Sequence, residues 1–325
     1  IFFRVLPLRK QNMLCSARSR TCTVQMPFGA IYSATSTIEL TAAPQSHDVT
    51  PRSMSLNNLE GHVNTVFCVA TLNNDHVVSG SWDTMIRVWS LETGECTQVL
   101  EGHRNWVSVL LVNNSNELVS GGWDGILNLW DLSEGTCVRT IEAHKGAVRA
   151  LASLKPQQVV SAGDGKAIKV WDLHQGTCIA TMKGHTKPVC ALVAVSPQEL
   201  ASASWDTTIR IWVQSKGGTW RAVRTLSGHT DAVSCLALLH DGRLVSGSRD
   251  TTIRVWDTAR ATCSSMATAT EAVTALAVCG DDVAATCMDG AVTIWTFPCV
   301  GSQGKPLCRL DTQQSALYAV DLHHK

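Results

Sequence analysis

Two residue series with one shared period constrain this chain more than any other feature of its sequence. Strand-like runs end in tryptophan six times, at spacings of 41, 41, 41, 44 and 39 residues: Trp89, Trp130, Trp171, Trp212, Trp256 and Trp295. Histidines keep the same spacings of 41, 41, 41 and 44 residues: His62, His103, His144, His185 and His229. Self-similarity at a period of this length is typical of repeat architectures.

Each unit has the pattern of four short strands. In the first unit, apolar residues alternate over 66–72, and an Asn-Asn-Asp turn follows. Further strand-like runs cover 77–79, 86–89 and 96–100, with turn residues between them. Short β-rich runs separated by Asn, Asp and Gly indicate antiparallel hairpins.

The motifs in these units resemble those of the WD-repeat family. They are the Gly-His pairs, the turns Ser-Gly-Ser-Trp-Asp at 79–83 and Ser-Ala-Ser-Trp-Asp at 202–206, and the terminal Trp, and together they cover roughly residues 59–296. The resemblance implies an all-β fold, a β-propeller whose four-stranded antiparallel blades ring a central channel. We expect seven blades, with six clear repeats and an incomplete or split seventh.

The expected propeller covers residues 52–325. Residues 1–51 are predicted to be an N-terminal extension, either disordered or contributing strands to the last blade. In a split seventh blade, 316–322 resembles a first strand and 52–56 a fourth. The middle strands would follow residue 325 or come from 30–34 and 37–41, and closure would remove exposed sheet edges.

Four units combine the residue types of a hydrogen-bonded chain inside a blade. An indole N–H only donates, a carboxylate only accepts, and Ser and His can do both. The sets are His62, Ser79, Asp83, Trp89; His103, Ser120, Asp124, Trp130; His185, Ser202, Asp206, Trp212; and His229, Ser246, Asp250, Trp256. The third unit keeps His144, Ser161 and Trp171, but its Asp164 is displaced by one position. The sixth unit has Ala269 and Ala285 where His and Ser are expected.

The same Ser, His and Asp types form nucleophilic triads in hydrolases. A triad needs an exposed nucleophile beside an oxyanion hole, and an enzyme needs only one. Four copies on the period of the repeat, each ending in Trp, favour a structural network and no catalytic site. Seven of the 13 cysteines recur at two positions of the repeat and suit small buried sites, so we expect neither a metal site nor a cofactor.

Binding on such a fold is expected where loops meet one end of the ring. The resemblance implies that the residue before each turn Asp and the loop after each Gly-His face that end. The candidate partner-binding residues are Trp82, Trp123, Trp205, Arg249, Trp106, Arg104, Lys145, Arg149 and Lys187. The indoles either lie flat over neighbouring blades or ring the channel mouth, and Trp and Arg are enriched at binding hot spots.

Composition narrows the function classes. Twenty-seven Lys and Arg balance 27 Asp and Glu, which argues against nucleic-acid binding, and no apolar run is long enough to span a membrane. We predict a non-catalytic scaffold or adaptor that binds other proteins or peptides, a monomeric propeller within a larger complex. The alternative is the substrate-recognition subunit of a ubiquitin ligase, reading acidic or phosphorylated peptides. The cysteine pattern favours a reducing compartment, the cytoplasm or nucleus.

Overall fold

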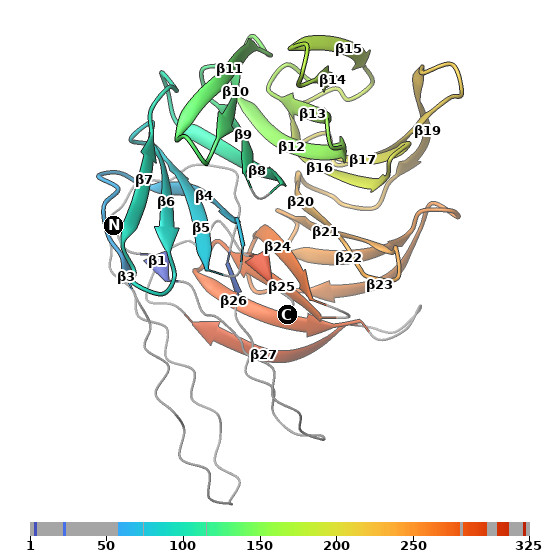
Figure 1. Ribbon diagram of the computed structural model, residues 1–325. Helices are drawn as coiled ribbons and strands as arrows, with labels where there is room; N and C mark the ends of the chain where they lie inside the picture. Colours follow the sequence, from blue (N-terminus) through green and yellow to red (C-terminus); the bar gives the residue numbers. More distant parts are fainter. Residues whose placement is uncertain are drawn as a thin grey trace, which may run out of the picture.

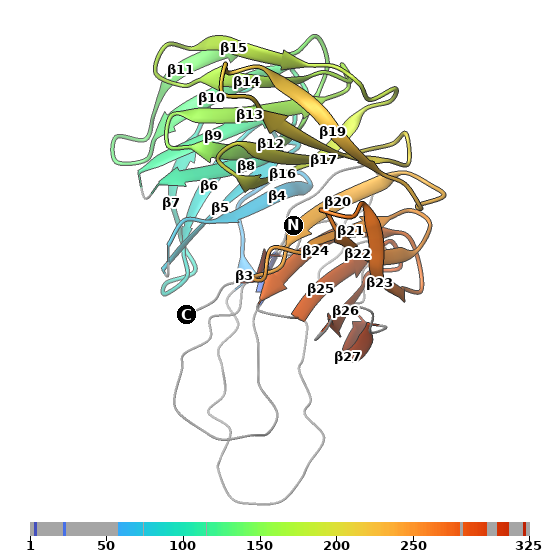
Figure 2. The ribbon, with the colours of Figure 1, turned by 90° about the vertical axis from the view of Figure 1, so that its right-hand side faces the viewer.

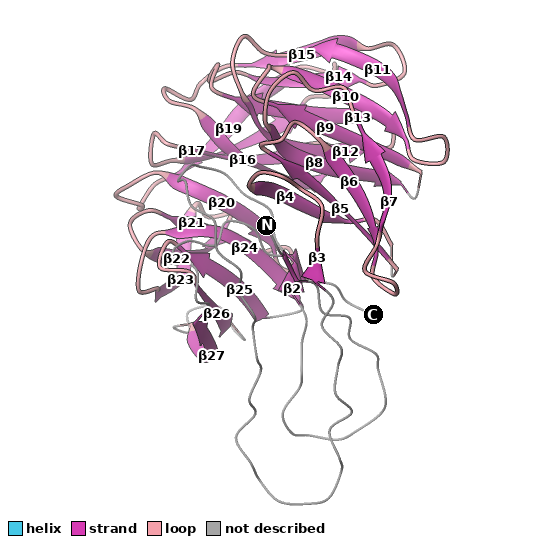
Figure 3. Cartoon of the chain, turned by 90° about the vertical axis from the view of Figure 1, so that its left-hand side faces the viewer, coloured by secondary structure: helices cyan, strands magenta, loops and turns pink. Residues whose placement is uncertain are grey.

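The fold is an assembly of antiparallel sheets around an axis. The computed structural model describes residues 3–4, 22–23, 58–73, 75–114, 116–279, 282–297, 304–311 and 321–322. Over these residues the chain forms strands and loops and no helix (Figure 3). Six four-stranded sheets surround a common axis, with β7, β11, β15, β19, β23 and β27 at the outside (Figure 1). The expected all-β propeller of four-stranded antiparallel blades is therefore confirmed for six blades.

Blades 1 to 6 follow one another along the chain. Blade 1 consists of β4 (Val66–Thr71), β5 (His76–Ser81), β6 (Ile86–Ser90) and β7 (Cys96–Leu100). Blade 2 consists of β8 (Val107–Asn114), β9 (Glu117–Gly122), β10 (Ile126–Asp131) and β11 (Thr136–Glu142). Blade 3 consists of β12 (Val148–Lys155), β13 (Gln158–Gly163), β14 (Ile168–Asp172) and β15 (Thr177–Met182).

The second half of the chain repeats this arrangement. Blade 4 consists of β16 (Val189–Ser196), β17 (Glu199–Ser204), β18 (Ile209–Gln214) and β19 (Trp220–Leu226). Blade 5 consists of β20 (Val233–Leu238), β21 (Leu244–Ser248), β22 (Thr252–Asp257) and β23 (Thr262–Thr268). Blade 6 consists of β24 (Val273–Cys279), β25 (Asp282–Cys287), β26 (Ala291–Thr296) and β27 (Lys305–Asp311).

The apolar core lies between neighbouring blades, which stack face to face (Figure 2). Glycine in the second strand allows this close approach in several blades. A Cβ on Gly80 would lie 2.6 Å from Val107 of the next blade, and one on Gly247 would lie 2.5 Å from Val273. The glycine of the Ser-Gly-Ser motif is thus explained by packing between blades.

Two short ladders lie between blades 1 and 6. β28 (Asp321–Leu322) pairs with β2 (Cys22–Thr23), and β1 (Phe3–Arg4) pairs with β3 (Asn58–Leu59). β28 contacts both β24 and β4, the innermost strands of the last and first blades. Most of the residues proposed for a seventh blade, 30–34, 37–41, 52–56 and 316–320, lie outside the described residues, as does most of the 1–51 extension. The seventh blade stays a prediction.

Candidate partner-binding face

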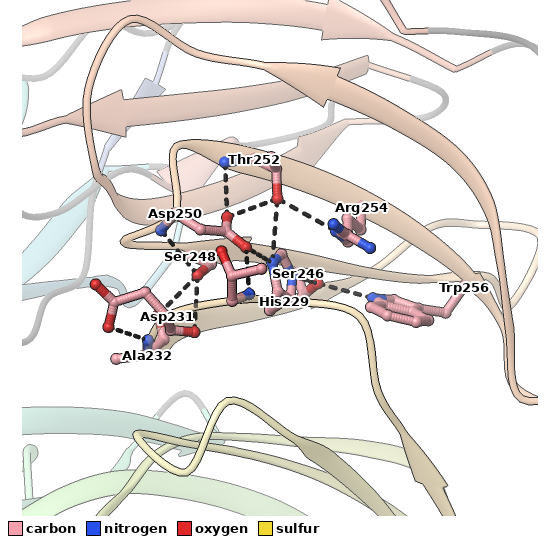
Figure 4. A network of polar contacts seen from close by, with 10 residues as sticks. His229, Asp231, Ala232, Ser246, Ser248, Asp250, Thr252, Arg254 and Trp256 are labelled. Atoms are coloured by element: carbon pink, nitrogen blue, oxygen red, sulfur yellow. Dashed lines mark hydrogen bonds and ion pairs between the residues drawn. The ribbon is translucent and has the colours of Figure 1, made fainter.

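Four blades contain the expected hydrogen-bonded chain from tryptophan to aspartate. In blade 5, Trp256 Nε1–H donates to Ser246 Oγ at 2.7 Å, and the hydroxyl of Ser246 donates to His229 Nε2 at 2.7 Å (Figure 4). His229 Nδ1–H then donates to Asp250 at 2.8 Å. Blades 1, 2 and 4 repeat these bonds at 2.7–3.0 Å among His62, Ser79, Asp83, Trp89; His103, Ser120, Asp124, Trp130; and His185, Ser202, Asp206, Trp212.

The aspartates of these chains also organise the loops around them. Asp250 Oδ2, which binds His229, also accepts from the Thr230 N–H at 2.9 Å. Its other oxygen, Oδ1, accepts from the Thr252 hydroxyl at 2.6 Å. Partial burial alone would raise the pKa of Asp250, but the hydrogen bonds from Thr252, Thr230 and His229 lower it to about 2. The pKa of Asp206 is lowered further against its own burial, by His185, Thr208 and Thr186.

Blade 3 has a different acid partner. His144 Nε2 bonds Ser161 at 2.7 Å, and Trp171 Nε1–H donates to the same hydroxyl at 2.8 Å. Asp164 instead accepts from Arg149 Nε at 2.5 Å. Burial, and then the charge of Lys169, lower the pKa of His144 to about 4, so this imidazole is neutral near pH 7.

Blade 6 lacks most of the hydrogen-bonded chain, and its strand register corrects one assignment made from the sequence. Ala285 stands where Ser is expected, and the buried Trp295 Nε1–H has no acceptor. The histidine position belongs to Thr270 and not to Ala269. In blade 2, Leu127 pairs with Ile141, and His144 follows three residues later. The equivalent pair in blade 5 is Ile253 with Ala267, so the position three residues later is Thr270. Thr270 Oγ1–H donates to Asp289 at 2.6 Å, in the manner of the histidines.

One end of the ring gathers the turns between second and third strands and the loops before first strands. In each of the six blades, one backbone hydrogen bond of 2.9–3.1 Å joins the turn to the loop. Its donor is the N–H of the residue before the turn Asp, or that of Asp164 in blade 3, and its acceptor is a carbonyl of the loop. The six bonds are Trp82 to Thr65, Trp123 to Trp106, Asp164 to Ala147, Trp205 to Pro188, Arg249 to Ala232 and Met288 to Ala272. We call this end the Trp-bearing face.

Side chains on this face form one continuous stack across blades 1 to 5. Trp82 lies parallel to Trp106 with ring centroids 4.0 Å apart, and Trp106 lies 4.5 Å from Trp123. Arg149 lies over both Trp123 and Trp205, at 5.5 and 5.2 Å, and Arg249 lies 5.4 Å from the Trp205 ring. We call these six residues the indole–guanidinium strip. The indoles therefore contact side chains of neighbouring blades.

The predicted binding residues differ in their exposure. The four indoles of the strip are half-buried, Arg249 is exposed, and Arg149 is only 6% exposed. Arg104, Lys145 and Lys187 are exposed beside the strip in the loops that precede the first strands.

Two further residues belong to this face, although sequence reasoning missed both. Phe67 stacks on Trp82 with ring centroids 5.5 Å apart. It occupies the same position in the first strand of blade 1 as Arg149 does in blade 3, because Phe67 follows Val66 and Arg149 follows Val148. Lys166 is exposed at a φ of 60° in the blade 3 turn, where blade 2 has Gly125. The sequence could have indicated Phe67 by its match to the strand position of Arg149, and Lys166 by the alignment of the blade 3 turn with the other turns.

The described residues hold no group of three His, Cys, Asp or Glu side chains able to bind a metal ion. Burial raises the pKa of the Cys190 thiol to about 12, with Arg149 and Arg249 opposing the rise. No helix of the described residues is long and apolar enough to cross a membrane.

Comparison with known families decides the identity of the fold. A family model described as WD domain, G-beta repeat matches residues 53–90, 94–131, 135–172, 176–213 and 220–257, which is more than half of the chain. The chain belongs to the WD-repeat family. The matches end before blade 6, the blade of these six in which Ala replaces the serine of the hydrogen-bonded chain.

Two solved structures are similar to this WD-repeat protein. "Structure of U3-55K" has 23% sequence identity and a TM-score of 0.70, and the match covers 77% of this chain and 83% of that one. "Crystal structure of RRP9 WD40 repeats" has the same identity and TM-score, with 77% and 82% covered. At this identity the likeness shows the fold alone. No curated protein matches the chain.

Proposed function

We propose that this WD-repeat protein is a non-catalytic scaffold that binds a protein or peptide on its Trp-bearing face. The indole–guanidinium strip carries the proposal, because it places four half-buried indoles and an exposed arginine on one face. Trp and Arg dominate binding energy at interfaces, and side chains already fixed by packing lose little entropy on binding.

Burial of the serines supports the non-catalytic role. Ser79, Ser120, Ser202 and Ser246 are each 0% exposed, and each accepts an indole N–H. A nucleophile must reach the substrate, so these hydroxyls are poorly placed for catalysis. Their positions suit a network that holds the blades.

The test compares partner capture by two folded variants. Trp82→Ala combined with Trp205→Ala removes rings from blades 1 and 4 of the face. Val138→Ala combined with Val223→Ala changes exposed residues of the outer strands β11 and β19 and serves as the control. Partners captured by the wild-type protein should be lost with the first variant and retained with the second. Equal capture by a folded Trp82/Trp205 variant would refute the proposed face.

We also propose that β28, β2, β1 and β3 form the split seventh blade. The register of β1 supports this, since Phe3↔Leu59 and Arg4↔Asn58 repeat Ile86↔Leu100 and Arg87↔Val99 of blade 1. β1 would then be the third strand and β3 the fourth. Removal of residues 1–5 should lower the melting temperature, and an unchanged melting temperature would contradict the assignment.

Two further expectations stay predictions. A ubiquitin-ligase subunit would carry an adaptor-binding segment before the propeller, and residues 1–51 are described only at β1 and β2. The cytoplasm or nucleus is still the expected compartment.

A further inference from the structure

Cations outnumber acids on the Trp-bearing face over blades 2 to 5. Over blades 2 to 5, the loops before the first strands and the turns carry six exposed cations: Arg104, Lys145, Lys166, Lys183, Lys187 and Arg249. Four turn acids there already have partners inside the protein: Asp124, Asp164, Asp206 and Asp250. The exposed acids of these segments are Glu101 and Asp231. The face is therefore basic over blades 2 to 5, although the whole chain has a formal net charge of zero.

The sign of the charge changes over blade 6. Glu271 and Asp289 are exposed there, in the loop 270–272 and the turn 288–290, and these two segments contain no Lys or Arg. An anionic ligand is thus attracted to blades 2 to 5 and repelled from blade 6.

The two arginines of the strip have different environments. Arg149 is buried and donates to Asp164 at 2.5 Å, so its charge is largely compensated inside the protein. Arg249 is exposed, and no acid among the described residues forms an ion pair with it. Its guanidinium is held 5.4 Å from the Trp205 ring, which reduces the side-chain entropy that a bound anion would have to remove.

We propose that Arg249 binds an anionic side chain of the partner, and that the partner segment is an acidic peptide lying over blades 2 to 5. This inference rests on the proposed function of the same face. Carboxylate and phosphate share the geometry that a guanidinium binds through two parallel N–H groups. Arg149 is a positioning residue that fixes Trp205 between itself and Arg249 and does not touch the peptide.

Stacking makes a peptide a better fit than single-stranded nucleic acid. Nucleic-acid channels combine basic grooves with aromatic faces on which bases stack. Each of the four indoles here already contacts another ring or a guanidinium. The half-buried indoles therefore offer little free ring surface on which a base could stack, whereas the exposed cations recognise charge.

Binding of labelled probes tests the proposal directly. The probes are a Glu-rich peptide, the same peptide with phosphoserine in place of some Glu, a Gln-rich peptide of equal length, and oligouridine. Their dissociation constants would be measured by fluorescence anisotropy with the full chain. The two acidic peptides should bind and the Gln-rich peptide should not, and the stronger of the acidic pair identifies carboxylate or phosphate as the preferred group.

The decisive variant is Arg249→Glu, with Arg260→Glu as its control. Arg260 is 80% exposed in the turn between β22 and β23, and its substitution changes the net charge equally. Arg249→Glu should weaken acidic-peptide binding about tenfold or more, as for loss of a charge-assisted bidentate contact. Arg260→Glu should leave it nearly unchanged. Equal weakening by both variants, or tighter binding of oligouridine than of either acidic peptide, would overturn the proposal.

The positioning role of Arg149 has a separate readout. Arg149→Met should leave the Gln-rich probe unbound, weaken the acidic peptides by less than Arg249→Glu does, and shift Trp fluorescence because the rings lose a cation. If Arg249→Glu has no effect while the Trp82/Trp205 variant still loses its partners, the acidic-peptide inference fails and the proposed function stands. If the Trp variant retains its partners, the proposed function fails.

Discussion

The indole of Trp82 in blade 1 lies parallel to that of Trp106 in blade 2, with ring planes 3° apart. The stack crosses the boundary between two sheets, so it joins elements that share no backbone ladder. Aromatic pairs of this kind contribute about 0.5–1.5 kcal/mol beyond the area they bury.

A double-mutant cycle measures this contact. We expect Trp82→Ala and Trp106→Ala to show a coupling free energy of about 0.5–1.5 kcal/mol in urea unfolding. The cycle of Trp82→Ala with Trp205→Ala is the control, since no ring contact joins these two. A coupling near zero for the Trp82/Trp106 pair would show that the stack does not stabilise the boundary.

Loss of the tryptophan at the end of the third strand should be far more costly. Trp89 is 0% exposed and donates to Ser79 at 2.7 Å, so Trp89→Ala creates a cavity and leaves a buried hydroxyl with one partner fewer. We expect the free energy of unfolding to fall by about 3–5 kcal/mol. Val99→Ala on the exposed strand β7 should change it by less than about 0.5 kcal/mol. A small effect of Trp89→Ala would contradict the structural role of the hydrogen-bonded chain.

Blade 3 should respond to mild acid. The pKa of His144 is held near 4 by burial and by Lys169, below its ordinary value of 6.5. The unfolded chain therefore binds the proton first, and stability is lost as the pH falls from 6.5 toward 4. His144→Gln should make the free energy of unfolding less dependent on pH in this window. His174→Gln, at an exposed position in the same blade, should leave the dependence unchanged.

The incomplete chain of blade 6 can be rebuilt. Ala285 is 0% exposed opposite Thr293, in the register where Ser246 lies opposite Arg254 in blade 5. Ala285→Ser should give the orphaned Trp295 N–H an acceptor, and adding Thr270→His should supply the next partner. We expect the double variant to raise the free energy of unfolding by about 1 kcal/mol, while Ala285→Ser alone gains less because its hydroxyl lacks an acceptor. A double variant less stable than Ala285→Ser alone would show that blade 6 cannot accommodate the imidazole.

Sequence reasoning predicted the repeated parts of this fold well, because each blade solves the same local problem with the same residues. The period placed His229, Ser246 and Asp250 in one unit, and the structure brings them together. It could not assign Asp164 to Arg149, since that pair depends on how the first strand of blade 3 faces its own turn.

The misplaced histidine position had a different origin. Histidine and Trp are 27 residues apart in the other five units, whereas Thr270 and Trp295 are 25 residues apart, so the regular spacing does not carry over to blade 6. The strand register shows that Thr270 takes the place. The exposure of each Trp also escaped prediction, because it depends on contacts between blades.

The position of Arg149 has a mechanical consequence for the molecule. Its guanidinium touches rings from the blade before it and the blade after it, while Asp164 anchors it to its own blade. Arg149 therefore joins three sheets through one side chain, and a partner bound at either ring rests on contacts with all three.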